Sequence, residues 1–570
     1  MVQQRNYGEW SKEELIREIL ALKKQKTYGL VWEREKTKED FDLFINWEGE
    51  KTKEEFSPES KDKFPVLAEV KDKEINSDKD KPVNLLIEGD NYHSLAVLNF
   101  THKNSVDVIY IDPPYNTGNK DFKYNDKFVD KEDGYRHSKW LSFMSKRLAL
   151  AKNLMTESGT IFISIDDNEI AQLRLLCDDV FGEENFVMDI IWNSRKSVSS
   201  DAIVSLNHNH TLLYTRNLAL LREQVKKNGK FKLPIDEDKF TNYDNDSRGN
   251  WVADPFEAAG VRKNLSYAIK NPNTGEIYYP VKGRHWAVLE EEYFKLLKDG
   301  KIVFGKNGKG KPSRKRFLSE AKEKGLTPKS IWDDVGTTTN GTQELEEIFG
   351  EKVFNNPKPV SLIKRIVKLA SHKKSVVLDF FAGTGTTGHA VLEMNKFDNG
   401  SRTFILCTNN EDNNGDNRKI CTDICYPRIS KVINGYTSMN TQKVDGLGGN
   451  LKYYKTDFVE AEQTDKNKRK LVDNCTEMLC IKENTFEKVK DAKKFKIFKN
   501  DKLHLGIIFD DDYIDEFVKE AEKISGKIHV YVFSHDDSVP TKEFKTIKNK
   551  VILKPIPETI LKVYRVVFKE

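Results

Sequence analysis

The chain has 570 residues, and its 94 lysines and arginines nearly balance its 90 aspartates and glutamates, which leaves a formal net charge of only +4. This length exceeds what a single hydrophobic core usually supports, so we expect about two to four domains. So small a net charge does not indicate a nucleic-acid partner by itself, and any such partner has to be argued from where the cations lie.

The cysteines and the apolar runs indicate the compartment. The six cysteines form no Cys-x-x-Cys pair, which is typical of reduced core thiols in a cytoplasmic protein and disfavours a zinc site. No apolar run approaches the roughly 18 residues of a membrane span, and no signal peptide opens the chain. We therefore expect a cytoplasmic protein that does not contact a membrane.

Residues 1–80 are rich in charge and contain one clear helical pattern. Ser11 and Glu14 form a capping box, and Leu15, Ile19 and Leu22 follow on one face of the predicted helix. A helix that docks on the rest of the protein or on a partner explains this pattern better than a catalytic role does.

Residues 81–193 alternate between strand-like and helix-like segments, as an α/β sheet requires. Residues 106–111 are a β-branched and aromatic run that must end at the two prolines that follow. Residues 140–155 predict a helix, and residues 159–165 predict the next buried strand. The acids at 166–169 suggest either a metal site or the cap of another helix, and capping is the better explanation.

Asp112-Pro113-Pro114-Tyr115 directly follows the first of these strands. Proline fixes φ and lacks a backbone donor, so the Asp112 carboxylate and the Pro113 carbonyl can face one spot without local competition. Two such acceptors suit the two hydrogens of an exocyclic amine on a nucleobase and favour its attacking form. Tyr115 offers a flat face on which an extruded base can stack. The alternative is a Pro-Pro turn without chemistry.

Residues 194–335 break this alternation and carry most of the local basicity. Residues 305–316 contain six cations, three glycines and no acid, which predicts a flexible cationic segment suited to phosphate contact. A solvated loop is the alternative. His208 and His210 have the spacing of metal ligands but no evident third ligand, so a paired position on a strand is the better explanation.

Residues 375–389 predict a strand, a Gly-rich turn and a helix. Glycines let the backbone approach a ligand at the carboxyl end of a strand, where doubly wound sheets bind nucleotides. The turn lacks the Lys-Ser/Thr ending of a P-loop, which disfavours triphosphate hydrolysis. Farther along, the strand-like runs at 503–509, 528–533 and 551–555 predict a small C-terminal α/β domain with a structural or docking role.

Together these motifs resemble those of the β-class DNA amino-methyltransferases, and most closely those of the Mod (modification) subunit of type III restriction-modification systems. The resemblance covers about residues 82–436 and includes the order of motifs, with the catalytic motif first. It implies an α/β, Rossmann-like, S-adenosylmethionine-dependent methyltransferase core in a permuted order, which is harmless because parallel strands need only be neighbours in space. The implied domains are a charged N-terminal helical region (1–80), the catalytic half of the core (81–193), a target recognition domain (194–335), the cofactor-binding half (336–440) and the C-terminal α/β domain (450–570).

The resemblance also implies roles for single residues. The catalytic motif is Asp112, Pro113, Pro114 and Tyr115, and Asp90 is expected to contact the adenine of S-adenosylmethionine. Glu411 falls where a carboxylate often holds the ribose hydroxyls. The residues expected to bind the cofactor are Asp90, Asn91, Asp112, Lys358, Pro359, Asp379, Phe381, Gly383, Gly385, Thr386 and Glu411, and the cations expected to contact DNA are Arg195, Lys306, Lys309, Lys311, Arg314, Lys315 and Arg316.

The implied activity is methyl transfer from S-adenosylmethionine to N6 of adenine in a specific sequence of double-stranded DNA, without a metal. Cytosine N4 methylation shares the geometry, but the family more often has Ser in place of Asp112 for that substrate. A non-catalytic DNA-recognition subunit is a further hypothesis, and so is a methyltransferase of RNA or protein. A homodimer and a separate restriction (helicase and nuclease) subunit are conceivable partners, and DNA binding would associate the protein with the nucleoid.

Overall fold

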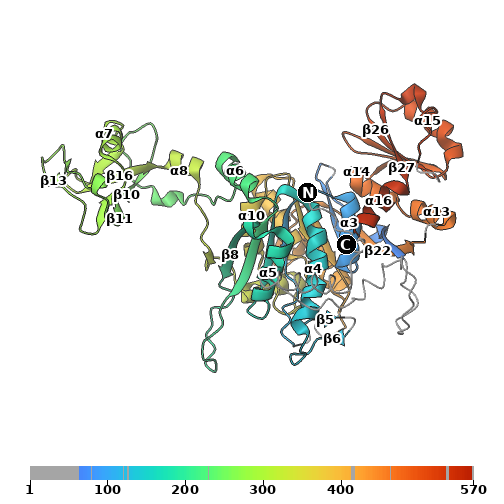
Figure 1. The fold of residues 1–570 in the computed structure, drawn as a ribbon, viewed down its shortest axis with the longest axis horizontal. Coiled ribbons are helices and arrows are strands. Elements are labelled where there is room, and N and C mark those ends of the chain that lie inside the picture. Colours follow the sequence, from blue (N-terminus) through green and yellow to red (C-terminus); the bar gives the residue numbers. More distant parts are fainter. Residues whose placement is uncertain are drawn as a thin grey trace, which may run out of the picture. The chain divides into compact units, whose positions relative to one another are not determined.

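The computed structural model describes residues 63–567 apart from residues 79, 120, 125–126, 229, 412–416, 463 and 535–537 (Figure 1). The helix predicted from Ser11 to Leu22 lies outside the described residues. The chain divides into two compact units, of which the first ends at Arg222 and resumes at Ser330, and the second is Glu223–Lys329.

The first unit is built on an 11-stranded sheet in the order β1-β22-β3-β19-β18-β4-β7-β9-β8-β17, with β2 beside β22. Neighbouring strands from β22 to β7 are parallel, and β9 is antiparallel to both β7 and β8. The strands predicted at 106–111 and 159–165 are confirmed. The strands are β1 Lys63–Glu69, β2 Ile75–Asn76, β3 Val83–Glu88, β4 Val106–Ile111, β7 Met155–Ile165, β8 Phe186–Trp192, β9 Asn209–Thr215, β17 Ile331–Trp332, β18 Val376–Asp379, β19 Thr403–Thr408 and β22 Asn450–Glu460.

Helices cover both faces of this sheet. Val108, Ile109, Tyr110 and Ile111 of β4 are all buried, and successive side chains of a strand point to opposite faces. Ile109 and Ile111 share a core with α3, α4 and α5, whereas α10 contacts β4 and α11 contacts β19. The helices of this part are α3 Asn91–Thr101, α4 Arg136–Leu154, α5 Ile170–Phe181, α9 Thr338–Phe349, α10 Val360–Ala370, α11 Thr386–Asp398 and α12 Tyr426–Asn434.

The register of two parallel strands brings the two predicted motifs together. β18 pairs with β4, with Val377 opposite Val108 and Leu378 opposite Ile109. Parallel neighbours end at the same edge of a sheet, so Asp112 and the Gly-rich loop (residues 380–385) follow adjacent strand ends. The predicted strand, Gly-rich turn and helix at 375–389 are confirmed as β18, this loop and α11.

The second unit, Glu223–Lys329, has its own core around Phe256, Trp286 and Tyr293. We expected the insert to span 194–335, but β9 is a strand of the first unit, where its Leu212 and Leu213 are buried. The unit contains a sheet ordered β10-β16-β15, two strand pairs and two helices: β10 Trp251–Pro255, β11 Glu257–Ala259, β12 Ile269–Lys270, β13 Ile277–Tyr278, β14 Arg284–Trp286, β15 Ile302–Phe304, β16 Pro312–Phe317, α7 Glu290–Lys298 and α8 Leu318–Lys324. Helix α6 (Leu218–Asn228) spans the boundary between the units.

The C-terminal region adds a five-stranded sheet to the first unit, ordered β23-β24-β25-β26-β27. The three predicted C-terminal strands are confirmed as β25, β26 and β27, whereas β22, expected in this domain, belongs to the main sheet. The elements of this region are β23 Glu487–Asp491, β24 Phe495–Lys499, β25 His504–Ile508, β26 Ile528–Phe533, β27 Val551–Ile556, α13 Asp465–Asp473, α14 Thr476–Glu483, α15 Ile514–Glu522 and α16 Glu558–Val567. Elsewhere in the first unit, two short strand pairs join β5 Lys123–Tyr124 with β6 Lys127–Phe128, and β20 Gly435–Thr437 with β21 Lys443–Asp445. Among the described residues, no helix combines the length and apolarity needed to span a bilayer.

Candidate active site

Strand β4 delivers Asp112 to a rigid turn at the edge of the sheet. Oδ2 of Asp112 accepts a hydrogen bond from Lys358 Nζ at 2.6 Å. Oδ1 is buried and finds no hydrogen-bond partner in the described part of the chain. The indole of Trp140 donates to the Pro114 carbonyl at 2.8 Å and fixes the turn. A buried acceptor left without a donor costs free energy, so Oδ1 is available to accept a hydrogen bond from a bound group.

Tyr115 stands beside this carboxylate, and its ring is partly exposed. Its hydroxyl accepts a hydrogen bond from Asn209 Nδ2 at 3.3 Å, and Asn209 is the first residue of β9. Burial and, after it, the charge of Asp112 raise the pKa of Tyr115 well above its ordinary value. The side chain is therefore a neutral phenol near pH 7. The contact with Asn209 gave no signal in the sequence, because it depends on the antiparallel pairing of β9.

Lys358 lies at the centre of the site. Its ammonium is 5.2 Å from the ring centroid of Tyr115 and 6.0 Å from that of Trp192. Burial alone would lower the pKa of Lys358, but the Asp112 carboxylate, together with Tyr110 and Asp166, raises it above its ordinary value. The lysine therefore remains charged. Lys358, which we expect to bind the cofactor, pairs its side chain with the Asp112 carboxylate. The cofactor role of Lys358 stays a prediction.

The Gly-rich loop is shaped by Asp379 and two left-handed glycines. Asp379 accepts hydrogen bonds from Phe381 N at 3.0 Å and from Thr387 Oγ1 at 2.5 Å, and burial raises the pKa of Asp379 to about 7. Gly383 and Gly385 have φ of +49° and +79°. A Cβ on Gly385 would lie 3.0 Å from Cys425 Sγ, whereas one on Gly383 would find nothing closer than 3.9 Å. The loop therefore packs on the core at Gly385 and faces open space at Gly383.

A buried arginine that the sequence did not indicate supports this loop. Arg428 of α12 donates hydrogen bonds to Thr384 Oγ1 at 3.0 Å and to Thr386 Oγ1 at 2.7 Å. Burial lowers the pKa of Arg428 to about 10, so the guanidinium stays charged near neutral pH. Thr386, which we expected to bind the cofactor, also donates to the Lys358 carbonyl at 3.3 Å.

Two expected cofactor residues, Asp90 and Asn91, follow β3, and Asn91 contacts the Gly-rich loop. Asp90 caps α3 by accepting from Tyr92 N at 2.7 Å, and Arg147 lies 3.3 Å from its carboxylate. Asn91 Nδ2 donates to the Phe380 carbonyl at 2.9 Å and ties the end of β3 to the Gly-rich loop. Glu411 is exposed beyond β19 and directly precedes residues 412–416, which lie outside the described part.

We expected the acids after β7 to cap helix α5, but Glu169 has a different role. Glu169 makes no side-chain capping hydrogen bond to α5. Its carboxylate is fully buried and accepts from Asn116 Nδ2 at 2.5 Å and His137 Nδ1 at 2.7 Å. Burial raises the pKa of Glu169. This acid therefore holds the residue after Tyr115, a role that spacing along the chain could not indicate.

The predicted cationic segment is a hairpin, with strands β15 and β16 on either side of a turn. Lys306, Lys309, Lys311 and Arg314 are exposed and form no ion pair with the described residues. Lys315 pairs with Asp244, and Arg316 donates to Asp254 at 2.8 Å. Two of the six cations are thus engaged within the protein, because they face acids on neighbouring segments.

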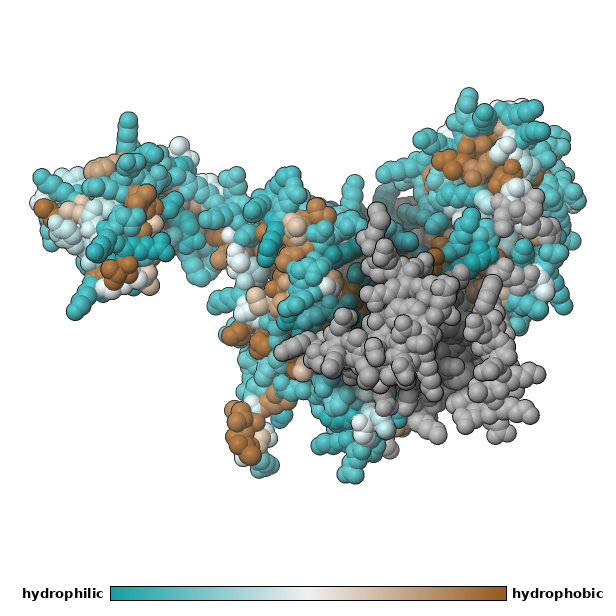
Figure 2. All heavy atoms as spheres, in the orientation of Figure 1, coloured by the Kyte–Doolittle hydropathy of each residue, from teal (hydrophilic) through white to brown (hydrophobic). Residues whose placement is uncertain are grey.

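Arg195 lies at the base of a loop between β8 and β9. Its Nε donates to Ser197 Oγ at 2.9 Å. Apolar side chains gather at the tip of this loop, where Val198, Ile203 and Val204 are exposed (Figure 2).

Comparison with known proteins identifies the class. Residues 106–424, more than half of the chain, match the model of the N6/N4 methyltransferase family described as DNA methylase. The chain therefore belongs to this DNA methylase family.

Particular relatives can also be named. The type III restriction-modification enzyme StyLTI Mod subunit of Salmonella typhimurium is 38% identical over 57% of this chain and 52% of its own length. The EcoPI Mod subunit of Escherichia phage P1 is 34% identical over 61% of this chain and 60% of its own. The chain thus spans little more than half the length of these Mod subunits. The type II methyltransferase M.KpnI of Klebsiella pneumoniae is 32% identical over 63% of this chain and 89% of its own length.

A solved structure was also matched, that of a DNA modification methylase from Thermus thermophilus complexed with S-adenosyl-L-methionine. It has 15% identity and a TM-score of 0.28, and it covers 57% of this chain and 88% of that one.

Proposed function

We propose that this protein transfers a methyl group from S-adenosylmethionine to N6 of adenine in a specific sequence of double-stranded DNA. Asp112 carries the proposal: one carboxylate oxygen is held by Lys358 and the other is buried without a partner in the described part of the chain. An amine hydrogen from the substrate would satisfy the second oxygen. For cytosine N4 methylation the family more often has Ser in place of Asp112, so Asp at this position favours adenine N6.

The chemistry follows from the same turn. When bound, S-adenosylmethionine supplies a methyl group that is already activated as a sulfonium. Asp112 Oδ1 and the Pro113 carbonyl accept the two amine hydrogens and favour a nitrogen that attacks the methyl carbon. Tyr115 stacks on the extruded base. The nitrogen gains the methyl group and loses one proton to Asp112 or water, and most of the acceleration comes from holding the two reactants together.

The edge of the sheet fits the methyl donor. Gly383 faces open space, and Asn91 ties the end of β3 to the loop that contains it. The residues that would hold S-adenosylmethionine are Asp90, Asn91, Asp112, Lys358, Pro359, Asp379, Phe381, Gly383, Gly385 and Thr386, with Glu411 as a further carboxylate near the end of β19.

The partners are part of the same proposal. The Glu223–Lys329 unit would recognise the target sequence, and its exposed cations Lys306, Lys309, Lys311 and Arg314 would contact phosphates. Two relatives are named as Mod subunits of type III restriction-modification enzymes, which supports a modification subunit that acts in the cytoplasm with a separate restriction subunit. The proposal also allows that the protein forms a homodimer, or that it acts as a methyltransferase without a restriction subunit.

The test is to express this protein alone in cells without other DNA methylation, digest their DNA to nucleosides and identify the modified base by mass. We expect N6-methyladenine with the wild type, none with Asp112→Ala, and wild-type levels with the control Asp501→Ala, which changes an exposed acid. Asp112→Ala should still bind DNA. Finding N4-methylcytosine, or no modified base with folded wild-type protein that binds DNA, would overturn the proposal.

A further inference from the structure

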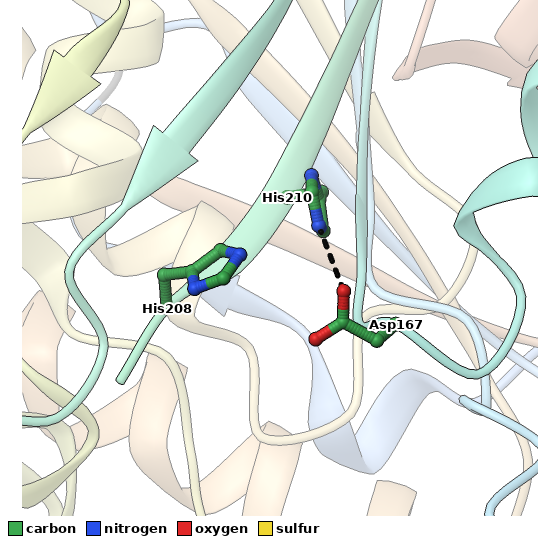
Figure 3. Close-up of side chains that lie close together, drawn as sticks. All are labelled: Asp167, His208 and His210. Atoms are coloured by element: carbon green, nitrogen blue, oxygen red, sulfur yellow. Dashed lines mark hydrogen bonds and ion pairs between the residues drawn. The ribbon is translucent and has the colours of Figure 1, made fainter. Parts of the chain in front are cut away.

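We propose that Asp167, His208 and His210 form a binding site for a divalent transition-metal ion of the zinc type. One ligand atom from each of the three side chains lies within 4.8 Å of the other two. Figure 3 shows the carboxylate of Asp167 reaching from a separate segment towards the two imidazoles. The sequence showed only the two histidines, and the fold supplies the third ligand.

The pairing of β7 with β9 explains why these residues meet. The two strands are antiparallel, with Ile165 opposite His210. Asp167 lies in the turn that directly follows β7, and His208 directly precedes β9. The strand register thus brings the end of β7 beside the start of β9, which places Asp167 near the two histidines.

The donor set selects the class of ion. Imidazole nitrogens suit zinc and other transition metals, whereas magnesium and calcium prefer oxygen ligands throughout. Two imidazoles and one carboxylate are a common set of three protein ligands for zinc, with a fourth position left for water. Asp167 is 52% exposed, which leaves room for that water.

The orientation of His210 fits a metal ligand. Its Nδ1 lies 2.9 Å from Asp189 Oδ2, which leaves Nε2 directed at Asp167. Histidines that bind metals usually give their other ring N–H to a carboxylate, which fixes the tautomer and the ring direction. Asp189 would therefore be a positioning residue for the site.

The distance between His210 and Asp167 is compatible with a shared ion. Nε2 and Oδ1 lie 3.4 Å apart. Zinc bonds of about 2.0–2.2 Å in a tetrahedron place neighbouring ligand atoms roughly 3.3–3.6 Å apart. These two atoms could therefore bind one zinc with little movement.

An ion here would fix the start of β9. Asn209 lies between the two histidines and donates to the Tyr115 hydroxyl at 3.3 Å. The ion would thus hold the strand that supports Tyr115, and it takes no part in methyl transfer. Metal binding is independent of the proposed function, because the site can bind an ion whether or not the protein methylates DNA.

The test uses the full chain, stripped of metal with a chelator and titrated with Co²⁺ and then Zn²⁺. We expect one equivalent of Co²⁺ with the visible absorption of a tetrahedral site, which Zn²⁺ displaces. His208→Gln and Asp167→Asn should lose this step, and Asp189→Asn should weaken binding by about 10- to 100-fold. The control His504→Gln changes a histidine far along the chain on β25 and should bind as the wild type does.

A second measurement, of the melting temperature, distinguishes the loss of metal binding from misfolding of a variant. Zn²⁺ should raise the melting temperature of the wild type and of His504→Gln but leave that of Asp167→Asn unchanged, and Asp167 is exposed enough for its replacement to be tolerated. A wild-type protein that shows no stoichiometric step with either metal would overturn the proposal. So would a His208→Gln variant that binds Zn²⁺ with wild-type affinity.

Discussion

The ammonium of Lys358 lies 2.6 Å from Asp112 Oδ2, although the two residues are 246 positions apart in the chain. Their side chains are only 9% and 29% exposed, so solvent screens the pair weakly. The contact fixes one carboxylate oxygen and leaves the other free to accept from a ligand. It also joins the Asp-Pro-Pro-Tyr turn at the end of β4 to the segment that precedes α10.

Replacing Lys358 with Met should therefore damage the site more than replacing a surface lysine would. The Asp112 carboxylate would lose its partner in a largely shielded position, which costs roughly 1–3 kcal/mol of stability. We expect single-turnover methylation to slow at least about tenfold, since the acceptor loses its fixed direction. The control is Lys364→Met, which removes an ion pair between α10 and Glu393 of α11. A Lys358→Met variant with the wild-type rate would show that the pair does not orient Asp112.

The sequence predicted each strand of the site but not the contacts between them. Residues 106–111 could be identified because their apolar run ends at two prolines, and the Gly-rich loop because its glycines follow another such run. The pairing of Lys358 with Asp112 depends on which strands become neighbours, and no local pattern encodes that. Arg428 was missed for the same reason, since a buried cation on a helix is recognisable only once its partners are in place.

The exposed cations of the β15–β16 hairpin predict how the DNA affinity depends on salt concentration. Replacing Lys306, Lys309, Lys311 and Arg314 together with Ala should weaken DNA binding and reduce the slope of log Kd against log salt by about 0.9 per lost phosphate contact. Lys315 and Arg316 are left in place because they pair with acids.

The matched control for charge is another set of four exposed cations, in the C-terminal region. Lys493, Lys502, Lys519 and Lys527, changed to Ala, alter the net charge equally. The slope should then stay close to the wild-type value. Equal slopes for the two quadruple variants would mean that the hairpin does not contact phosphates. Fluorescence anisotropy with a labelled duplex at several salt concentrations measures both.

The buried carboxyl of Asp379 predicts a dependence of stability on pH. Burial raises its pKa from 3.8 to about 7 in the folded protein. Between these values the folded state keeps a proton that the unfolded chain has released, so this group's contribution is full below pH 4 and is lost as the pH rises through 7. The loss approaches about 1.4 kcal/mol per pH unit.

Asp379→Asn should remove this dependence. The unfolding free energy of the variant relative to the wild type should rise by roughly 4 kcal/mol between pH 4 and pH 8. In Asp398 the hydrogen bond from Arg402 lowers the pKa, so Asp398→Asn should show no such rise above pH 5. Urea unfolding followed by fluorescence at several pH values measures the difference. Parallel curves for Asp379→Asn and wild type would mean that this carboxyl titrates normally.

Arg428 supports the Gly-rich loop from α12, so replacing it should affect both stability and cofactor binding. Arg428→Met would remove charged hydrogen bonds to Thr384 and Thr386, each worth roughly 1.5–3 kcal/mol. We expect a clear fall in melting temperature and about a tenfold weaker binding of S-adenosylmethionine, because the loop beside Gly383 would lose its support. The control Arg469→Met removes a half-exposed ion pair with Asp510 and should change neither quantity much. If Arg428→Met melted early but bound S-adenosylmethionine as tightly as the wild type in calorimetry, the arginine would stabilise the core without shaping the loop.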